Sequence, residues 1–500
     1  MSVNQQQAPD PQQLQQAAAA GDVMAAIELG SHLLENSAPN SADYQRGLQH
    51  LQSALDSAQA AYAHWALAAH WLQHMTLPAP RQKALEHLQQ AAAAGLAPAM
   101  DRLANQYLRG IGLEFAPQRA MRLLQSLADG GFQRFAWDVG YLHSLQDDAA
   151  AAADAAAAFA RACAMGYPPA YYSLGMRFAG GHGVARDVDF ARALLLRAAD
   201  AGFPDARTAA EALSAQADHG ACQQWYTRLQ QNLAAAQQPL QSLQTAGMLV
   251  DDSLLPVIRR LEAHFACLGH PSLRIGADQR LQVLAANAYQ YQAAPQAWQW
   301  HAQQPRIATS DEFISDEEAA HLQFLVAAEL APPETYTTAA SNSQTENSFF
   351  TGLGRSFGAL SSDTVVRMIE RRIAAATDWD LTALEPSSVI RYQPGHEYRS
   401  HVDYFTSEQI AQNKQQLEDF SGQRVVTFLI CMVAPLQGGE TLYDRVGVRI
   451  GYRRRMAAMH FNTAADGKPE PLSLHTGTPV LAGEKWLLRT TLREFSRYQS

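Results

Sequence analysis

The chain has 500 residues, of which 47% are hydrophobic and 17% charged, and its formal net charge is −10. This length predicts two or three domains, and the acidic balance excludes a general nucleic-acid binder, which would carry a basic face. Four cysteines without metal-ligand spacing exclude a disulfide framework and favour a reducing compartment. The sequence shows no secretory signal and no apolar run long enough to cross a bilayer, so we expect a cytoplasmic protein without membrane segments.

A repeated pattern follows a short Gln- and Pro-rich start. Residues 1–16 are expected to be disordered. From residue 17, the pattern Ala-Ala-x-Gly recurs every 35 to 38 residues, and its anchors are Gly21, Ser57, Gly95, Gly131, Gly166 and Gly202. This period predicts units of two helices joined by a glycine turn, in which small alanines let the helices approach closely. Each unit leaves an apolar face that the next unit covers, so residues 17–215 are predicted to form an all-α solenoid.

One stretch of these repeats carries a family resemblance. YYSLGMRFAGGHGVARDVDFARALLLRAADAGFPDA, from Tyr171 to Ala206, closely resembles a Sel1-like repeat, a relative of the tetratricopeptide repeat. The likeness is strong over residues 95–215 and weaker in the first two units, which lack the Gly-x-Gly loop seen at Gly110 and Gly181. The resemblance implies an interaction scaffold that holds a protein partner.

The chain changes character after the repeats. Residues 216–300 keep a helical pattern, as in SLLPVIRRLEAHF, and are interpreted as a helical cap and linker. In the predicted domain 301–500, a short strand precedes a helix whose N-cap is Ser315, with acidic residues in its first turn. A second helix is expected to start near Asp363.

Short β segments dominate beyond Glu385. They are SSVIRY, RVVTFLICMV, RMAAMHF, LSLHTG and KWLLRTTLREF, separated by Gly, Pro and Asp turns. Many short strands after two helices predict an α+β domain, a β-sandwich or jelly roll with helices on one side. A basic cluster, Arg449 with Arg453–Arg455, is either a solvated strand face or a charged rim around a binding site.

Three residues of this domain suggest a metal site. His401 and Asp403 are two positions apart, so on an extended segment they share one face. Alone the pair is weak, because a surface turn explains such a pair more often than a metal site does. His475, 72 residues further on, supplies a third ligand. Two histidines and one carboxylate leave three coordination positions open, as non-haem Fe(II) oxygenases require.

Lys485 follows His475 by ten residues, on the next predicted strand. A lysine on a strand is usually solvated surface. Beside a metal site, its charge can instead pair with the far carboxylate of a 2-oxo dicarboxylic acid.

The surrounding blocks resemble the catalytic core of the prolyl 4-hydroxylase family. They are VIRYQPGHEYRSHVDYF, QRVVTFLICMVAPLQGGETLY and SLHTGTPVLAGEKWLLRTTLRE, and the likeness covers roughly residues 305–500. The resemblance implies a double-stranded β-helix fold, Fe(II) and 2-oxoglutarate as cofactors, and ascorbate to keep the iron reduced. It implies that iron is bound by His401, Asp403 and His475. It also implies that Lys485 holds 2-oxoglutarate, that Tyr392 and Thr427 line the cosubstrate pocket, and that Gly438–Thr441 shape its opposite wall.

The sequence departs from the family at two positions, where Cys431 and Thr491 replace a frequent tyrosine and tryptophan. The hypothesis from the resemblance is a 2-oxoglutarate-dependent dioxygenase, similar to procollagen-proline 4-dioxygenase, that hydroxylates a peptidyl residue, first of all proline. The repeats would recruit its protein substrate or partner. Two alternatives stay open at this point: a Sel1-like scaffold with a vestigial oxygenase domain, and an oxygenase of small molecules.

Overall fold

The computed structural model describes residues 10–39, 41–235, 248–249, 273–275, 280–283, 297–331, 351–416 and 420–498. The chain divides into two compact units. The first comprises residues 1–123 with 358–362 and 497–500, and the second comprises 124–357 and 363–496.

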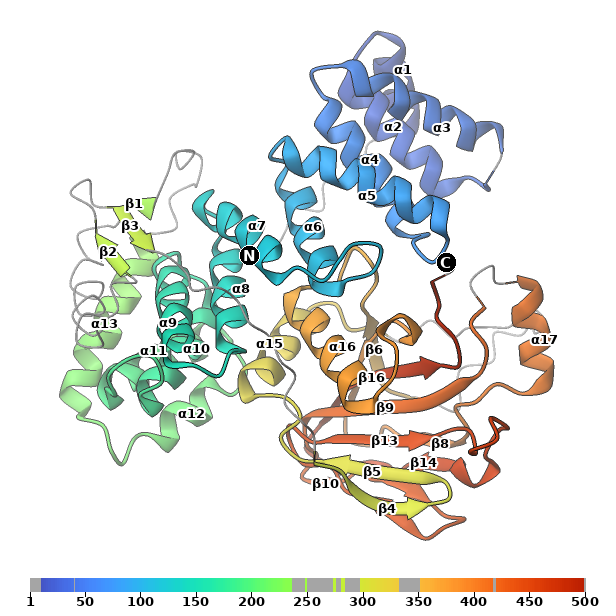
Figure 1. Cartoon of the computed structure of the whole chain (residues 1–500). Coiled ribbons are helices and arrows are strands. Elements are labelled where there is room, and N and C mark those ends of the chain that lie inside the picture. The colour runs from blue at the N-terminus through green and yellow to red at the C-terminus, as the bar shows by residue number, and fades with distance from the viewer. Residues whose placement is uncertain are drawn as a thin grey trace. The chain divides into compact units, whose positions relative to one another are not determined.

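Paired helices build the first unit, drawn in blue in Figure 1. They are α1 Pro11–Ala19, α2 Val23–Asn36, α3 Ala42–Ser53, the 3-10 turn η1 Ala54–Asp56, α4 Ala60–Leu72, α5 Pro78–Ala93 and α6 Ala97–Arg109. The repeat anchors Gly21, Ser57 and Gly95 lie between the two helices of each pair. Gly21 and Gly95 have φ angles of +95° and +82°, as turn glycines do.

The expectation of a disordered start is corrected in part. Helix α1 begins at Pro11, inside the stretch 1–16 that was expected to lack structure. The Asp10 side chain caps the helix by accepting a 3.0 Å hydrogen bond from the Gln12 backbone N–H, and proline is favourable in the first helical turn. Leu14 is buried, so tertiary packing also stabilises this turn. Residues 1–9 lie outside the described residues.

The helix pairs continue in the second unit. They are α7 Pro117–Asp129, which begins in the first unit, α8 Gln133–Ser144, α9 Ala149–Ala164, α10 Pro168–Gly180, α11 Val188–Asp200 and α12 Ala206–Ala212. Gly131, Gly166 and Gly202 again lie between paired helices. The loop glycine Gly183, at φ +72°, lies against α9 so closely that a Cβ there would be 2.0 Å from the Ala152 carbonyl oxygen. The predicted helical solenoid is confirmed in both units.

The interpretation of residues 216–300 as a helical cap and linker is corrected in part. Helix α13, His219–Ala235, is followed by a three-stranded antiparallel sheet in the order β1-β3-β2. Its strands are β1 Met248–Leu249, β2 Leu273–Ile275 and β3 Arg280–Val283. Apolar and polar residues alternate in β2 and β3, which is the strand period, and the helical pattern upstream masked it. The segment SLLPVIRRLEAHF lies outside the described residues.

Three antiparallel sheets form the C-terminal part. Seven strands pair in the order β4-β5-β13-β9-β16-β7-β6, four in the order β12-β11-β14-β8, and two as β10-β15. The elements are β4 Gln299–Gln303, β5 Arg306–Ser310, α15 Asp316–Val326, β6 Leu353–Ser356, α16 Thr364–Thr377, η3 Leu381–Ala383, β7 Ser388–Tyr392, β8 Tyr398–His401, α17 Ser407–Gln416, β9 Arg424–Val433, β10 Gln437–Gly438, β11 Thr441–Tyr443, β12 Val448–Ile450, β13 Ala457–Phe461, η4 Pro471–Ser473, β14 His475–Gly477, β15 Val480–Ala482 and β16 Lys485–Arg493.

The two larger sheets share one buried core. Tyr443 and Ile450 of the four-stranded sheet belong to the same apolar cluster as Cys431 and Leu487 of the seven-stranded sheet. Helices α15 and α16 lie on the other face of the larger sheet (Figure 1). Their N-caps are Ser315, in a full capping box, and Asp363, as predicted. The predicted jelly roll with helices on one side is confirmed.

Within the second unit, the repeat helices pack directly on the helices of the β domain. Trp137 of α8 stacks on His321 of α15, with ring centroids 4.3 Å apart and planes 8° apart. Tyr141, also in α8, donates a 2.6 Å hydrogen bond to the buried Glu318. Arg372 of α16 pairs with the same carboxylate at 2.9 Å. Buried rings and a neutralised charge therefore join the repeats to the domain.

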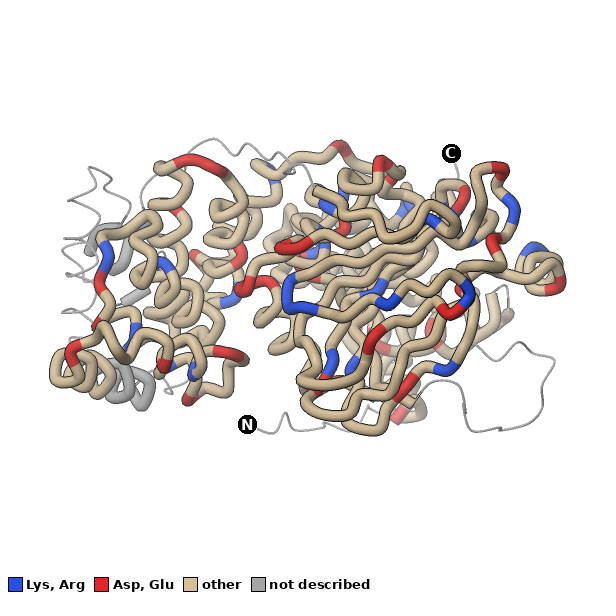
Figure 2. Tube along the Cα trace, turned by 90° about the horizontal axis from the view of Figure 1, so that it is seen from below, with Lys and Arg blue, Asp and Glu red and all other residues tan. Residues whose placement is uncertain are grey.

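In the basic cluster, Arg449 lies on strand β12, whereas Arg453–Arg455 lie in and beside the turn before β13. Arg454 pairs with Asp205, after α11, and with Asp316 of α15, both at 2.8 Å. Arg453 pairs with Asp311 and Arg455 approaches Glu312. Figure 2 shows acidic and basic residues interspersed along the described segments. These arginines therefore hold structural contacts.

Among the described helices, none combines the length and the apolar character that crossing a membrane demands.

Candidate metal centre

Two histidines lie directly opposite each other on neighbouring strands of the four-stranded sheet. His401 ends β8 and His475 begins β14, and the pairing of these strands places them directly opposite, with ring centroids 4.3 Å apart. The Nδ1 atom of His401 lies 2.7 Å from the Arg399 carbonyl oxygen, and that of His475 lies 2.9 Å from the Ser473 carbonyl oxygen. Because a carbonyl accepts, both Nδ1 atoms carry the hydrogen. Both Nε2 atoms are therefore left as lone-pair donors.

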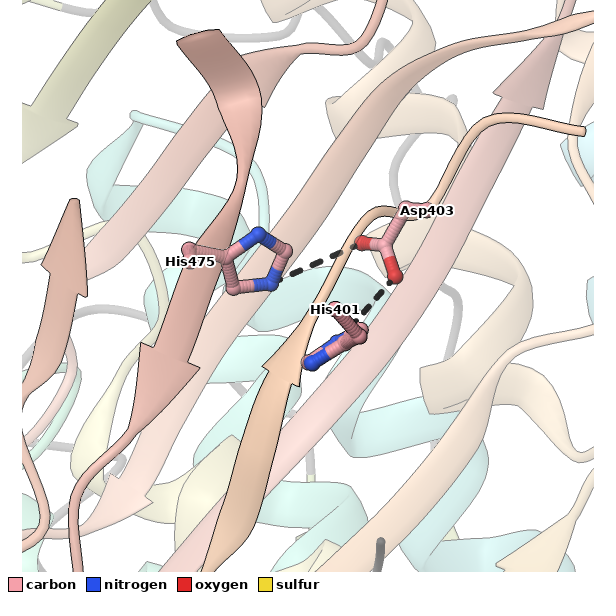
Figure 3. Close-up of side chains that lie close together, drawn as sticks. All are labelled: His401, Asp403 and His475. Carbon is pink, nitrogen blue, oxygen red and sulfur yellow. Dashed lines mark ion pairs between the residues drawn. The ribbon is translucent and has the colours of Figure 1, made fainter. Parts of the chain in front are cut away.

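Asp403 completes the group from a bend just after β8 (Figure 3). The extended segment predicted to carry both residues ends at His401, so the carboxylate is not aimed by strand alternation. It is aimed by Thr427 of β9, whose hydroxyl donates a 2.6 Å hydrogen bond to Oδ2. The His401 Nε2 lies 3.5 Å from Oδ1, and the His475 Nε2 lies 4.0 Å from Oδ2.

The three residues have the geometry and protonation of a cation site. One ligand atom from each lies within 4.8 Å of the others. Burial lowers the pKa of His475 to about 3, so its imidazole is neutral. Burial alone would raise the pKa of Asp403, but the neighbouring histidines His401, His460 and His475 and the positive charge of Arg489 hold it well below its usual range. Two neutral imidazoles and one carboxylate are the donor set of a facial triad, which fits ferrous iron.

Lys485 starts β16 and is buried, at 2% exposure. Its Nζ donates a 2.8 Å hydrogen bond to the Gly439 carbonyl oxygen and lies 4.3 Å from the ring centre of Tyr392. Burial lowers its pKa to about 8. Within the described part of the chain no carboxylate forms an ion pair with it. A buried ammonium group without an ion-pair partner favours an anionic ligand, because burying an unpaired charge is costly. The structure brings the predicted neighbours Lys485 and Tyr392 together.

Polar residues beside the triad were not predicted from the sequence. His460 of β13 is buried, its Nε2 lies 3.4 Å from Asp403 Oδ2, and its Nδ1 lies 2.8 Å from the Tyr443 hydroxyl. Asn462 donates a 3.0 Å hydrogen bond to the Thr427 hydroxyl. Cross-strand register was the missing signal, because His460 is directly opposite Thr427.

The two departures from the family pattern are buried. Cys431 is fully buried near Lys485, and burial raises the pKa of its thiol to about 12, so the thiol is uncharged. Thr491 pairs in register with Thr427, and its buried hydroxyl finds no partner among the described residues. Smaller side chains therefore stand where the family often has large rings.

Comparisons with known proteins give prolyl 4-hydroxylases among the similar sequences. No family model matches the chain. Prolyl 4-hydroxylase 1 of Arabidopsis thaliana is 27% identical over 281 residues, 50% of this chain and 93% of that protein. Two other prolyl 4-hydroxylases of that plant match over 66% and 50% of their own lengths.

Solved structures give weaker likenesses. A viral collagen prolyl hydroxylase from Paramecium Bursaria Chlorella virus-1 covers 37% of this chain and 95% of its own, at 19% identity and a TM-score of 0.29. A Sel1 repeat protein from Oxalobacter formigenes covers 46% of this chain and 66% of its own, at 22% identity and a TM-score of 0.35.

Proposed function

Given a prolyl 4-hydroxylase-like domain that follows Sel1-like repeats, we propose that this chain is an Fe(II)- and 2-oxoglutarate-dependent dioxygenase that hydroxylates a peptidyl residue, with proline as the first candidate. One observation carries the proposal. Three ligands from two chain segments, His401 with Asp403 and the distant His475, converge in a domain whose buried Lys485 no carboxylate neutralises within the described residues.

The iron would be held by the two Nε2 atoms and the Asp403 carboxylate. When bound, it supplies the oxygen chemistry that no side chain can perform. The chain's own contribution is to hold the ligands in place. Backbone carbonyls fix both imidazole tautomers, and Thr427 fixes the rotation of the carboxylate. Such supporting contacts typically raise metal affinity by about 10- to 100-fold.

The cosubstrate would lie between the metal site and Lys485. A 2-oxo dicarboxylate has one carboxylate beside its keto group and another at the far end. The far carboxylate would receive the Lys485 ammonium, which lies on the ring faces of Tyr392 and Tyr452, 4.3 and 5.2 Å from their centres. Burial strengthens this charge interaction relative to one at the surface.

The proposed substrate is a protein or peptide. Support comes from the similar sequences, whose names are those of prolyl 4-hydroxylases. The repeats would recruit that protein or a separate partner. Helix α8 packs on the catalytic domain through Trp137 and Tyr141, so a protein bound to the repeats of the second unit would be held in a fixed orientation toward that domain. Ascorbate as a reductant and a cytoplasmic location are part of this proposal.

A scaffold with a vestigial oxygenase domain is disfavoured by the intact ligand set. Loss of function removes selection on metal ligands and on the contacts that orient them. Here both the ligands and their supporting hydrogen bonds are in place.

The test is turnover by the purified full chain. We expect succinate release that requires Fe(II), 2-oxoglutarate and a proline-containing peptide together, with hydroxyproline recovered from the peptide. Proteins captured on the chain should show a mass increase of one oxygen atom only when iron and 2-oxoglutarate are both supplied. Peptide-independent succinate release, with a small molecule as the only stimulating substrate, would favour the small-molecule alternative.

A further inference from the structure

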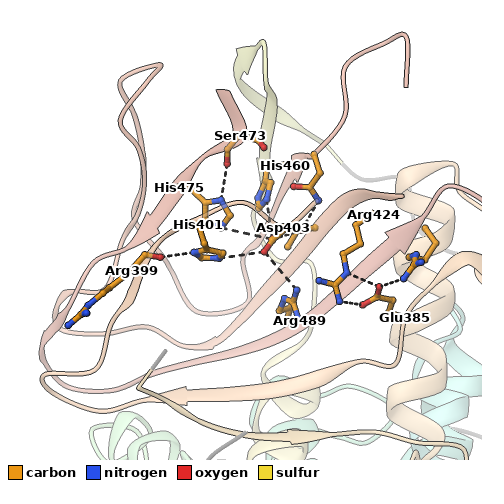
Figure 4. Close-up of polar contacts among 12 residues, drawn as sticks. Glu385, Arg399, His401, Asp403, Arg424, His460, Ser473, His475 and Arg489 are labelled. Carbon is orange, nitrogen blue, oxygen red and sulfur yellow. Dashed lines mark hydrogen bonds and ion pairs between the residues drawn. The ribbon is translucent and has the colours of Figure 1, made fainter. Parts of the chain in front are cut away.

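A guanidinium group lies beside the metal centre without a hydrogen-bonding partner. Arg489 is on β16, on the same face of the strand as Lys485 and Leu487. Its Nη2 is 3.9 Å from Oδ1 of Asp403, which is an ion-pair distance but too long for a hydrogen bond. Figure 4 shows its side chain pointing toward Asp403. The described part of the chain contains no hydrogen bond to this group.

The neighbouring arginines are already neutralised. Arg424 forms two hydrogen bonds with Glu385, of 2.8 and 2.9 Å, and Arg493 adds a third at 2.9 Å. Arg493 also donates to the Gly422 carbonyl oxygen. The negative charge of Glu385 is therefore largely compensated by the guanidinium groups of Arg424 and Arg493. Among the described residues, Arg489 forms its ion pair with Asp403, and Glu385 acts on it only at longer range.

Metal binding removes that counter-charge. Once Asp403 ligates a divalent cation, its negative charge is shared with the metal, and the guanidinium is left beside a second positive centre. Arginine is suited to a carboxylate, because its planar donors form two parallel hydrogen bonds with the two oxygens. With a metal bound, an anionic group beside Arg489 would therefore be favourable, and the described residues do not supply one.

The cosubstrate does not fill this role. Lys485 lies four residues earlier on the same strand, which separates the two positions by roughly 13 Å along β16. The Lys485 side chain is buried at 2% exposure, whereas the Arg489 side chain is 26% exposed. Lys485 thus lies at the buried end of this face of β16, and Arg489 lies at the end that is partly exposed to solvent.

We propose that Arg489 is a specificity-determining residue that binds a carboxylate of the substrate, so that the enzyme selects peptides with an acidic group next to the residue it hydroxylates. This inference rests on the proposed function and adds the substrate class to it. The carboxylate can come from an Asp or Glu side chain or from the end of a peptide chain, and matched peptides separate these two sources.

The experiment compares four peptides that share one proline. In the first pair, the residue beside the proline is Asp in one peptide and Asn in the other, and both peptides have an amidated C-terminus. In the second pair, the peptides have no acidic side chain and end at the proline, one with a free C-terminal carboxylate and one with an amidated C-terminus. The affinity for each peptide is measured by fluorescence anisotropy on the full chain loaded with Mn(II) and 2-oxoglutarate. The kcat/KM for each peptide is measured on the full chain loaded with Fe(II). The wild type should favour the acidic member of at least one pair by about tenfold or more. The pair that responds identifies the source.

The variants assign the preference to one side chain. Arg489→Gln should bring the ratio near one, and Arg489→Glu should favour a peptide with Lys in place of Asp. Arg453→Gln, at an exposed arginine outside the site, should keep the wild-type ratio. Equal or unmeasurable affinity for the acidic and neutral peptides, or a preference that survives in Arg489→Gln, would overturn the proposal.

Two further readouts separate this inference from its premises. Mn(II) affinity should stay within about threefold of wild type in Arg489→Gln, because Arg489 does not hydrogen-bond the ligand carboxylate. A large loss would mean that the residue supports Asp403 instead, which contradicts substrate binding. The anisotropy measurement gives the peptide preference whether or not succinate is released. Absence of the proposed reaction can therefore be told apart from absence of a preference for acidic peptides.

Discussion

Tyr141, in the helical repeats, donates a 2.6 Å hydrogen bond to Glu318 at the start of helix α15, 177 residues further along the chain. The carboxylate is buried at 1% exposure and also receives two hydrogen bonds from Arg372. Burial by itself would raise the pKa of Glu318, and these partners lower it overall, so the group is charged. The repeats thus help to satisfy a buried charge of the catalytic domain.

This contact predicts a measurable loss of stability in Tyr141→Phe. The substitution keeps the ring but removes a donor to a charged group, which costs about 1–3 kcal/mol in the free energy of unfolding. Urea unfolding followed by circular dichroism measures the change. Tyr62→Phe, at a tyrosine that is 47% exposed, is the control and should leave the midpoint unchanged. Equal midpoints for both variants would show that the Tyr141 hydroxyl contributes nothing.

Removal of one metal ligand should abolish the reaction. His401→Ala is expected to bind Fe(II) or Mn(II) at least about a hundredfold more weakly than wild type and to release no succinate, since two ligands do not retain the cation. Metal titration by calorimetry, beside a succinate assay, checks both effects. His396→Ala, five residues away in a turn, should bind metal normally. Coupled turnover by the His401→Ala chain would refute the iron assignment.

Thr427 offers a sharper test because the sheet contains its own control. Thr427→Val removes the 2.6 Å hydrogen bond to Asp403 with almost no change of shape, and metal affinity should fall by about 10- to 100-fold. Thr491→Val, at the position opposite on β16, removes a hydroxyl with no partner among the described residues. That variant should bind metal as tightly as wild type. If the two variants lost affinity equally, the hydrogen bond would not be the cause.

The lowered pKa of Lys485, about 8, predicts that binding of 2-oxoglutarate depends on pH. The ammonium is charged below pH 8, so affinity should fall as the pH rises through that value and the amine becomes neutral. Lys485→Arg keeps its charge and should show no such fall between pH 7 and about pH 9. Lys485→Ala should mainly raise the 2-oxoglutarate concentration needed. Titration of 2-oxoglutarate into the Mn(II)-loaded chain at several pH values measures both effects.

Lys485 should also make folding stability depend on pH, with the opposite sign to its effect on 2-oxoglutarate binding. The folded pKa of about 8 lies below the ordinary value of 10.5 for an unfolded lysine. Between these values the unfolded chain binds more protons than the folded chain, so the free energy of unfolding should gain from Lys485 as the pH rises from 8 to 10.5. Comparison of wild type with Lys485→Met over this range isolates the contribution, which should be absent in the variant.

Several local features could be predicted from the sequence because short-range physics produces them. The 35- to 38-residue period located the turns at Gly95, Gly131, Gly166 and Gly202, where a left-handed backbone suits glycine. Ser315 and Asp363 were predictable helix starts because their side chains cap the next backbone N–H groups. Helix α1 and the strands β2 and β3 were missed, since a Gln-rich composition and a neighbouring helical pattern outweighed short local signals.

The sequence by itself determined the repeat period, the strand pattern and the ligand types His401, Asp403, His475 and Lys485, because these depend on residue chemistry and spacing along the chain. Only the tertiary structure decided which side chains surround them. His460, Asn462 and Arg489 reach the metal centre through the pairing of β13, β9 and β16. Strand pairing joins residues that are distant in sequence, and no local pattern encodes which hydroxyl or guanidinium will lie opposite a given carboxylate.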